Sequence, residues 1–142
     1  MPVPPRVSFA TLCVRDLPAM AAFYRSLGWP ESKENDQGFA AFQCHGAILG
    51  LYGVEHYSER YGPAPAPGAF RGVVLAINLE SPAAVDAAYE TIRATAGARV
   101  RGAPADLPFG RSFEFSDPED NVWEVTFARG TSFDACGGLI FP

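Results

Sequence analysis

The sequence lacks the features of several large classes of protein. Lys and Arg number only 11 against 16 Asp and Glu, a formal net charge of −5, and they form no basic cluster, which argues against a nucleic-acid partner. No apolar run approaches the roughly 20 residues that cross a bilayer, so we expect no membrane partner. The first residues, Met-Pro-Val-Pro-Pro-Arg, also lack the charged-then-apolar order of a secretory signal.

Cysteine and histidine are scarce as well. Cys13, Cys44 and Cys136 are odd in number and form no CxxC pair, which predicts reduced, mostly buried thiols in a cytoplasmic protein. A reactive thiol at Cys136 is the less favoured alternative. His45 and His56 are the only histidines, and we expect both on exposed loops rather than at a metal.

The order of the predicted elements repeats along the 142 residues, of which 48% are hydrophobic and 19% charged. The first half predicts a strand at 7–14, a helix from the cap Asp16 to Gly28, and strands at 39–43 and 47–52. The second half predicts a strand at 73–79, a helix after Ser81-Pro82 that ends at Gly97, and strands at 100–101, 111–115 and 122–127. Each half is therefore strand, helix and about three strands, with a period of roughly 65 residues.

This repeat predicts an α+β fold of two tandem βαβββ modules that form a curved mixed sheet around a cleft. We expect a single domain over residues 1–142, with repeats at about 6–53 and 70–128, a connecting loop at about 53–70 and a C-terminal tail at 129–142. The loop contains Tyr57 and Tyr61, which would stack on a planar ligand if the loop closes over a pocket. A packed surface loop is the more favoured alternative.

The segment from Phe115 to Phe127 carries the most specific local pattern. Asp117-Pro118 predicts a turn, and Asp120-Asn121 can adopt the left-handed conformation that closes it. The residues that follow alternate between two faces, and Glu124 lies in the middle of the predicted strand. A carboxylate at such a position either pairs with an Arg or with backbone donors, or it contacts a ligand or acts as a base.

Two motifs in order resemble the vicinal-oxygen-chelate superfamily, which holds glyoxalase I, extradiol dioxygenases and the bleomycin- and fosfomycin-resistance proteins. The first helix contains Asp16-Leu17 and then Phe23-Tyr24-Arg25-Ser26-Leu27-Gly28, similar to the family pattern D-L-x…F-Y-x-x-L-G. Residues 117–124 are similar to the family ending D-P-D-G-N-x-W/I-E, with Asp120 where glycine is usual. The resemblance extends from about Val7 to Ala128 and implies the glyoxalase/bleomycin-resistance/dioxygenase fold.

Metal-using members of that family place one ligand on each of four strands, two in each half. The resemblance assigns these positions here to Phe9, Gly50, a residue at or beside Val74, and Glu124. Only Glu124 offers a donor, whereas a catalytic site typically needs about three protein ligands. We therefore predict no metal and no other cofactor. The alternative is one divalent metal ion held by an atypical set that includes Glu124 and a histidine.

Strand alternation extends these positions to a candidate ligand pocket. If Phe9 points inward, Thr11 shares its face, Tyr52 shares the face of Gly50, and Asn78 shares that of Val74. A mostly apolar pocket with a few polar groups is typical of a small-molecule site, although a core filled by Phe9 would have the same composition. The candidate binding residues are Phe9, Thr11, Gly50, Tyr52, Val74, Asn78 and Glu124.

We predict a protein that binds a small aromatic or cationic molecule in a cleft, as the resemblance to the bleomycin-resistance type implies, rather than an enzyme. The same resemblance implies a homodimer. The alternative is a metal-dependent glyoxalase- or dioxygenase-like enzyme, a lyase or an oxidoreductase, whose best catalytic candidate is Glu124. A third possibility is a metal-independent enzyme with Glu124 as general base, which requires that Glu124 be buried.

Overall fold

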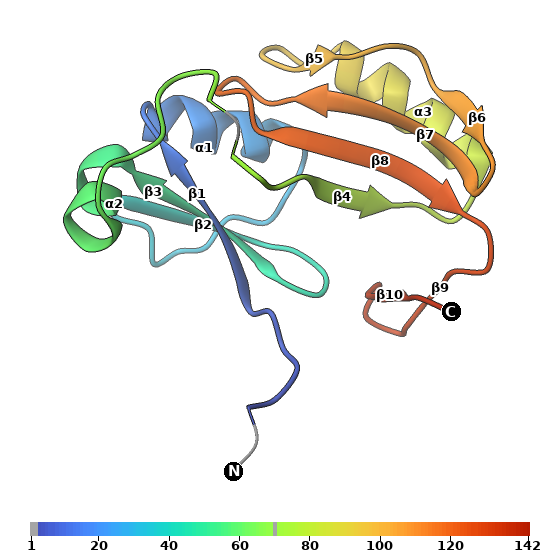
Figure 1. Ribbon diagram of the computed structural model, residues 1–142, viewed down its shortest axis with the longest axis horizontal. Helices are drawn as coiled ribbons and strands as arrows, with labels where there is room; N and C mark the ends of the chain where they lie inside the picture. The colour runs from blue at the N-terminus through green and yellow to red at the C-terminus, as the bar shows by residue number, and fades with distance from the viewer. Residues whose placement is uncertain (1–2, 70) are drawn as a thin grey trace. The chain divides into compact units, whose positions relative to one another are not determined.

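The computed structural model describes residues 3–69 and 71–142 (Figure 1). Met1 and Pro2 of the proline-rich start, and Phe70 at the start of the second predicted repeat, lie outside the described residues. The described chain has an α+β fold with mixed sheets, as predicted. Its elements are β1 (Phe9–Val14), α1 (Leu17–Ser26), β2 (Phe39–Gln43), β3 (Ile48–Gly53), α2 (Val54–Tyr61), β4 (Leu75–Asn78), α3 (Pro82–Arg93), β5 (Arg99–Val100), β6 (Ala105–Leu107), β7 (Gly110–Ser116), β8 (Val122–Ala128), β9 (Ser132–Phe133) and β10 (Leu139–Ile140).

The chain divides into two compact units. Unit 1 comprises Met1–Ala64 and Ala135–Gly138, and unit 2 comprises Pro65–Asp134 and Leu139–Pro142. The division falls inside the segment at about 53–70 that we expected to connect two repeats. No helix in the described part of the chain has both the length and the apolar character that a membrane span requires.

Unit 1 contains a three-stranded sheet in the order β1-β3-β2, with β1 parallel and β2 antiparallel to β3. As predicted, helix α1 begins at the cap Asp16, whose Oδ1 accepts a hydrogen bond from the Ala19 backbone nitrogen at 3.0 Å. It ends before Gly28, which has a φ of +80° that favours glycine. The face of the sheet toward α1 forms the core, and its buried residues include Val14, Phe42, Leu49 and Leu51.

Unit 2 repeats this plan in a five-stranded sheet of order β4-β8-β7-β5, with β6 paired to β7. The cap is Ser81, whose Oγ accepts a hydrogen bond from the Ala84 backbone nitrogen at 3.1 Å. From helix α3, Val85 and Ile92 are buried. The sheet residues buried on the same side are Phe113, Phe115, Trp123 and Val125, and the Phe115 and Trp123 rings stack with centroids 6.3 Å apart.

The segment expected as a loop at about 53–70 is partly helical. Residues Val54–Tyr61 form α2, because the chain has no Gly or Pro between Gly53 and Gly62. Tyr57 and Tyr61 are one helical turn apart and their rings are in contact, with centroids 5.3 Å apart. The prediction of a connecting loop was therefore wrong for the first half of this segment.

Strands β1 and β4 begin later than predicted, each at the first residue that the register pairs with a neighbouring strand. Strand β1 begins at Phe9 rather than at residue 7, because Phe9 pairs with Ile48, the first residue of β3. Strand β4 begins at Leu75 rather than at residue 73, opposite Trp123 of β8. The short pairs β6–β7 and β9–β10 had no counterpart in the prediction, since their two- and three-residue strands are too short for an alternation pattern.

Candidate functional site

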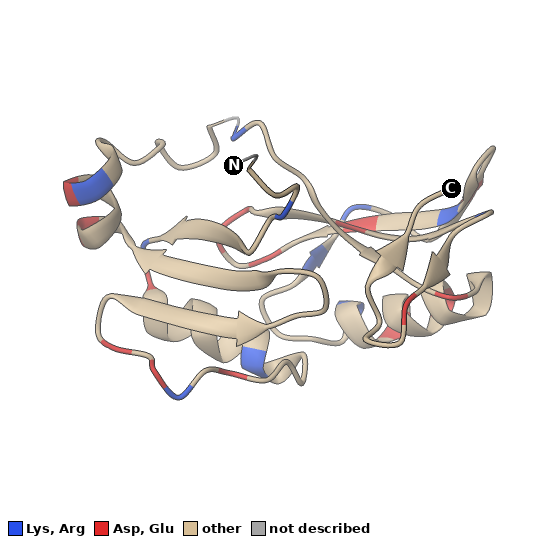
Figure 2. Cartoon of the chain, turned by 90° about the horizontal axis from the view of Figure 1, so that it is seen from below, with Lys and Arg blue, Asp and Glu red and all other residues tan. Residues whose placement is uncertain are grey.

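In unit 1, the sheet face turned away from α1, here the far face of unit 1, carries no charge. The register places Thr11 and Ala41 beside Gly50, and Cys13 and Phe39 beside Tyr52. Figure 2 shows these strands without acidic or basic positions along their length. The residues on the far face of unit 1 are Phe9, Thr11, Cys13, Phe39, Ala41, Gln43, Ile48, Gly50 and Tyr52.

Five rings form a continuous line of contacts that we call the aromatic strip. The ring centroids of Phe9 and Phe39 are 6.5 Å apart, and those of Phe39 and Tyr52 are 5.2 Å apart. Tyr61 lies 6.4 Å from Tyr52 and 5.3 Å from Tyr57, so α2 extends the line beyond the sheet. Phe9 is 48% exposed and Tyr61 is 58% exposed. A contiguous exposed aromatic surface of this kind commonly marks a binding site.

Gly50 allows the rings to lie close to the backbone. A Cβ atom added there would lie 3.0 Å from Thr11 Oγ1, 3.3 Å from Phe39 Cε2 and 3.4 Å from Phe9 Cδ1. The side chains of these three residues therefore occupy the space above the glycine. Nothing on this face resembles the carboxylate that metal-using members of the related family place at the position of Gly50.

The two histidines lie in different surroundings within unit 1. The imidazole of His56, on α2, packs on Gly38, where an added Cβ would lie 2.3 Å from its Cε1. The ring of His45, in the turn between β2 and β3, lies against the tail, since a Cβ added at Gly137 would lie 3.2 Å from its Cγ. His45 is exposed, as predicted, whereas His56 belongs to a helix rather than to a loop.

In unit 2, the sheet face turned away from α3, here the far face of unit 2, is polar. Glu124 is half-buried, and its Oε1 accepts a hydrogen bond from Ser112 Oγ at 3.1 Å. Its cross-strand neighbours are Ala76 on β4 and the exposed Glu114 on β7, so two carboxylates are directly opposite each other. Like charges in this position destabilise a sheet. Within the described part of the chain no Arg pairs with Glu124, and its side chain lacks the full burial that a role as general base requires.

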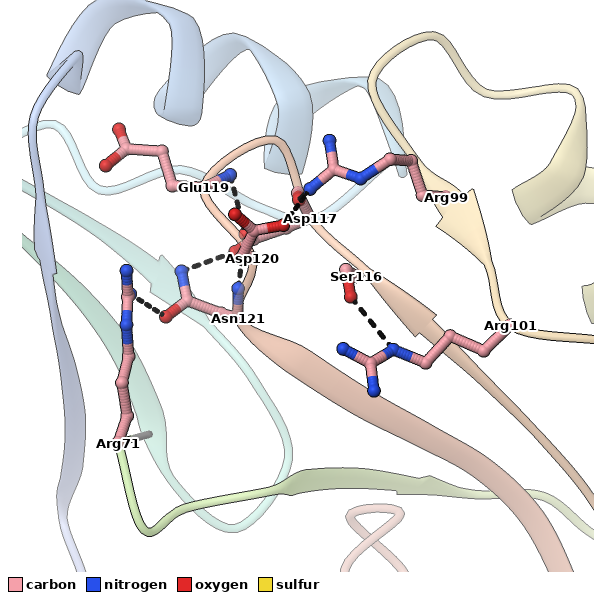
Figure 3. A network of polar contacts seen from close by, with 8 residues as sticks. All are labelled: Arg71, Arg99, Arg101, Ser116, Asp117, Glu119, Asp120 and Asn121. Atoms are coloured by element: carbon pink, nitrogen blue, oxygen red, sulfur yellow. Dashed lines mark hydrogen bonds and ion pairs between the residues drawn. The ribbon is translucent and has the colours of Figure 1, made fainter. Parts of the chain in front are cut away.

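The turn between β7 and β8 sets the register that brings the two carboxylates together (Figure 3). Asp117 is fully buried, and its carboxylate accepts hydrogen bonds from the backbone nitrogens of Glu119 and Asn121 at 3.0 and 2.9 Å. It also accepts one from Asn121 Nδ2 at 2.8 Å. Asp120 has a φ of +67°, so the predicted left-handed conformation is confirmed there.

Two arginines hold this turn from neighbouring segments. Arg71, which precedes β4, donates a hydrogen bond to Asn121 Oδ1 at 2.7 Å. Arg99 on β5 pairs with the Asp120 carboxylate and donates to the Asp117 carbonyl oxygen at 3.0 Å. Figure 3 shows both side chains converging on the turn, with Arg101 bonded to Ser116 alongside. The network is therefore structural support for the β7–β8 hairpin.

The donor set does not fit the metal site of the related family. Phe9 and Gly50 have no donor atom, and their space is filled by rings and the Thr11 methyl and hydroxyl groups. Val74 lies before β4, is 60% exposed, and also has no donor. Across residues 3–69 and 71–142, no group of three or more His, Cys, Asp and Glu side chains is placed to hold an ion.

The predicted binding residues fall into two sets. Phe9, Thr11, Gly50 and Tyr52 share the far face of unit 1. Asn78 and Glu124 share the far face of unit 2, where Asn78 is opposite Thr126. Val74 lies outside the strands, which corrects its predicted place on an inward strand face.

Sequence reasoning missed Phe39 and Glu114 as members of these faces. Both were detectable, because counting outward from the two hairpin turns pairs Phe39 with Tyr52 and Glu114 with Glu124. The thiols also differ from expectation. Cys13 and Cys44 are half-buried and Cys136 is exposed, and none of the three forms a disulfide bond within the described part of the chain. Burial raises the pKa of the Cys44 thiol.

Comparison with known proteins adds to this geometry. A family model described as Glyoxalase/Bleomycin resistance protein/Dioxygenase superfamily matches residues 6–125. A glyoxalase-related enzyme from Fulvimarina pelagi has 26% identity and a TM-score of 0.83, with 96% of this chain and 98% of that chain covered. A glyoxalase/bleomycin resistance protein/dioxygenase from Nocardioides has 31% identity and a TM-score of 0.78, with 92% and 88% covered.

A more distant structure shares the fold alone. Lactoylglutathione lyase from Agrobacterium tumefaciens has 24% identity and a TM-score of 0.69, with 88% of this chain and 95% of that chain covered. Among curated protein sequences, none matches the chain significantly.

Proposed function

Because the chain belongs to the Glyoxalase/Bleomycin resistance protein/Dioxygenase superfamily, we propose that it binds a small aromatic molecule on the aromatic strip, without a metal ion. The observation that carries this proposal is the line of five rings joined by four contacts, which begins on an uncharged sheet face and continues onto α2, with Phe9 and Tyr61 half exposed. Aromatic rings 4.5–7 Å apart gain about 0.5–1.5 kcal/mol per pair beyond the burial of their area.

The expected affinity is modest. A ligand that contacts two or three rings gains a few kcal/mol from ring contacts and a similar amount from apolar area, and part of this is lost to immobilisation. We expect dissociation constants of roughly 10 µM to 1 mM for simple aromatic compounds.

The absence of a metal from the proposed function is supported by donor chemistry. Three of the four positions at which metal-using relatives carry ligands are Phe9, Gly50 and Val74, whose side chains offer no lone pair. At the fourth position, the Glu124 carboxylate accepts a hydrogen bond from a serine hydroxyl, an interaction that needs no metal ion. The alternative, a metal-dependent lyase or oxidoreductase, would need a ligand set that these residues do not supply.

Nuclear magnetic resonance titration tests the proposed binding. Addition of naphthol to the labelled protein should shift the amide signals of Thr11, Gly50 and Tyr52 while leaving those of α3 unchanged. Phe9→Leu should weaken the binding several-fold, because leucine keeps apolar bulk but has no ring. The matched control is Phe109→Leu, since Phe109 is 46% exposed but lies in unit 2. Equal binding by both variants would contradict the proposed site.

Metal analysis tests the other half of the proposal. Protein purified without a metal-affinity step, and then soaked separately in zinc, nickel, manganese and iron salts, should retain less than one ion per chain in mass spectrometry. One tightly held ion per chain, lost on Glu124→Gln, would favour the enzyme alternative.

The expected homodimer is a separate proposal. It is supported by exposed apolar side chains in unit 2, among them Val73 at 63%, Val74 at 60% and Phe141 at 75% exposure. Sedimentation velocity should give the mass of two chains, and a single 15.2 kDa species at all concentrations would contradict it.

A further inference from the structure

We infer that the ligand of the aromatic strip is an uncharged aromatic molecule of two or more rings, with a hydroxyl or carbonyl group that hydrogen-bonds to Thr11. This inference rests on the proposed function and narrows it to one chemical class. Three properties of the site support it: the spacing of the rings, the lack of charged residues on the sheet face that carries them, and the Thr11 hydroxyl beside Phe9 and Phe39.

The spacing of the rings favours more than one ring in the ligand. Neighbouring centroids along the strip are 5.2–6.5 Å apart, and the planes are tilted by 48–61°. A single ring can lie against one of these rings at a time. A fused or linked pair of rings can meet one side chain face-on and the next edge-on, which are the arrangements that aromatic pairs prefer.

The lack of charge on the far face of unit 1 favours a neutral ligand. None of its strand residues is acidic or basic, so a bound ammonium or carboxylate would lose water without gaining a counter-charge. A cation would gain from the ring faces, but at exposed sites this attraction amounts to only about a two- to fivefold gain in affinity. Desolvation of an unpaired ion costs more than that.

Arg60 does not reverse this argument. Its guanidinium lies 5.6 Å from the centroid of the Tyr61 ring, at the end of the strip formed by α2. It therefore repels a cation at that end. An anion there would meet an exposed guanidinium on a helix that also carries Glu55 and Glu59, an arrangement that discriminates weakly.

Thr11 supplies the polar group. Its Oγ1 lies beside Gly50, where the edges of the Phe9 and Phe39 rings also lie. In the described part of the chain, the hydroxyl of Thr11 makes no hydrogen bond, and the residue is exposed. The hydroxyl both donates and accepts, so it can pair with a phenol or a carbonyl group of a molecule that lies on the rings.

The test compares four compounds that share one ring system: naphthalene, naphthol, naphthoate and naphthyltrimethylammonium. Affinities are measured by fluorescence titration or nuclear magnetic resonance titration at pH 7, where the hydroxyl group of naphthol is un-ionised. The location of binding is checked by protection of Cys13, which lies on the far face of unit 1, from alkylation. We expect naphthol to bind at least tenfold more tightly than either ion.

Variants of Thr11 test the hydrogen bond. Thr11→Val has the same shape and should weaken naphthol binding about three- to tenfold without changing naphthalene binding. Thr11→Ser keeps the hydroxyl and should bind naphthol as the wild type does. Equal naphthol affinity in the wild type and Thr11→Val would overturn the role of Thr11.

The remaining outcomes separate the inference from the proposed function. If the cation or the anion binds as tightly as naphthol and still protects Cys13, the ligand class is wrong and the site stands. If none of the four compounds binds or protects Cys13, the proposed function fails together with this inference.

Discussion

The two sheets follow one plan and carry opposite chemistry. In unit 1, Gly50 is flanked by Thr11 and Ala41, and in unit 2 the equivalent Glu124 is flanked by Ala76 and Glu114. The helix caps and the apolar faces toward α1 and α3 are alike, whereas one far face holds a line of rings and the other holds two opposed carboxylates. The fold depends on the helix-facing residues, so the far faces are free to diverge.

The largest expected effect comes from replacing Gly50 of unit 1 by glutamate, the residue type at the equivalent position 124 of unit 2. Gly50→Glu should lower the free energy of unfolding by about 4 kcal/mol, because the carboxylate would be forced among rings without a partner. It should also abolish naphthol binding. Urea denaturation measures the first effect and titration the second.

Gly50→Ala is the control. Its Cβ would sit 3.0–3.4 Å from its three neighbours, so small shifts suffice and the change should stay within about 1 kcal/mol. A Gly50→Glu protein as stable as Gly50→Ala would show that the rings do not pack over this glycine.

The next effect concerns the β7–β8 turn of unit 2, which is held by the buried Asp117 carboxylate. Asp117→Ala should lower the free energy of unfolding by about 3 kcal/mol, because two backbone nitrogens and the Asn121 amide lose their buried acceptor. Asp117→Asn keeps one acceptor and should cost less. The equivalent turn in unit 1 is exposed at His45, and His45→Ala should change the unfolding midpoint little. Similar losses in Asp117→Ala and His45→Ala would remove this difference between the units.

A smaller effect of the opposite sign should follow from removing the like-charge pair. Glu114→Gln should raise the free energy of unfolding by about 0.5 kcal/mol at low salt, because Glu124 then faces a neutral amide. The gain should shrink as salt is added, since salt screens the repulsion. Glu80→Gln, an exposed acid outside the sheet, is the matched control. A destabilised Glu114→Gln protein would contradict the assigned repulsion.

The smallest effect contrasts this pair with an opposite-charge pair in unit 1. Arg25 Nε lies 2.6 Å from Glu31 Oε2, and this hydrogen bond lowers the pKa of the Glu31 carboxyl. The pair therefore stabilises the fold above the ordinary Glu pKa, and this contribution is lost as the pH falls through the lowered value. The stability difference between wild type and Glu31→Gln, followed by urea denaturation, should vanish in acid. A difference that grows as the pH falls would exclude this linkage.

Much of the fold was predictable because its signals are local. The caps Asp16 and Ser81, Gly28 after α1 and the turn at Asp117-Pro118 each act over a few residues, and the structure confirms them. Helix α3 ends at Arg93, so the prediction that it continues to Gly97 was wrong. Helix α2 was missed because glycine and proline at 62–68 dominate the segment and obscure the eight residues before them. Strand ends were misplaced because they depend on where a distant partner begins, as at Phe9 and Leu75.

The candidate site was predictable only in part. Alternation within a strand identified Phe9 with Thr11, and Gly50 with Tyr52, as residues of one face. It could not show that Phe39, Tyr57 and Tyr61 extend this set to a line of rings, because those contacts join β2 and α2 to the sheet. Ring contacts between elements depend on packing angles that no local pattern encodes.

The sequence by itself determined the family, the repeated order of elements and the absence of donor atoms from the side chains of Phe9, Gly50 and Val74, because each is a matter of residue type and spacing along the chain. The tertiary structure alone decided that rings fill the space above Gly50 and that Glu114 is opposite Glu124. Both depend on strand register, which brings together residues far apart in the chain and so decides whether a side chain meets a ring, a charge or water.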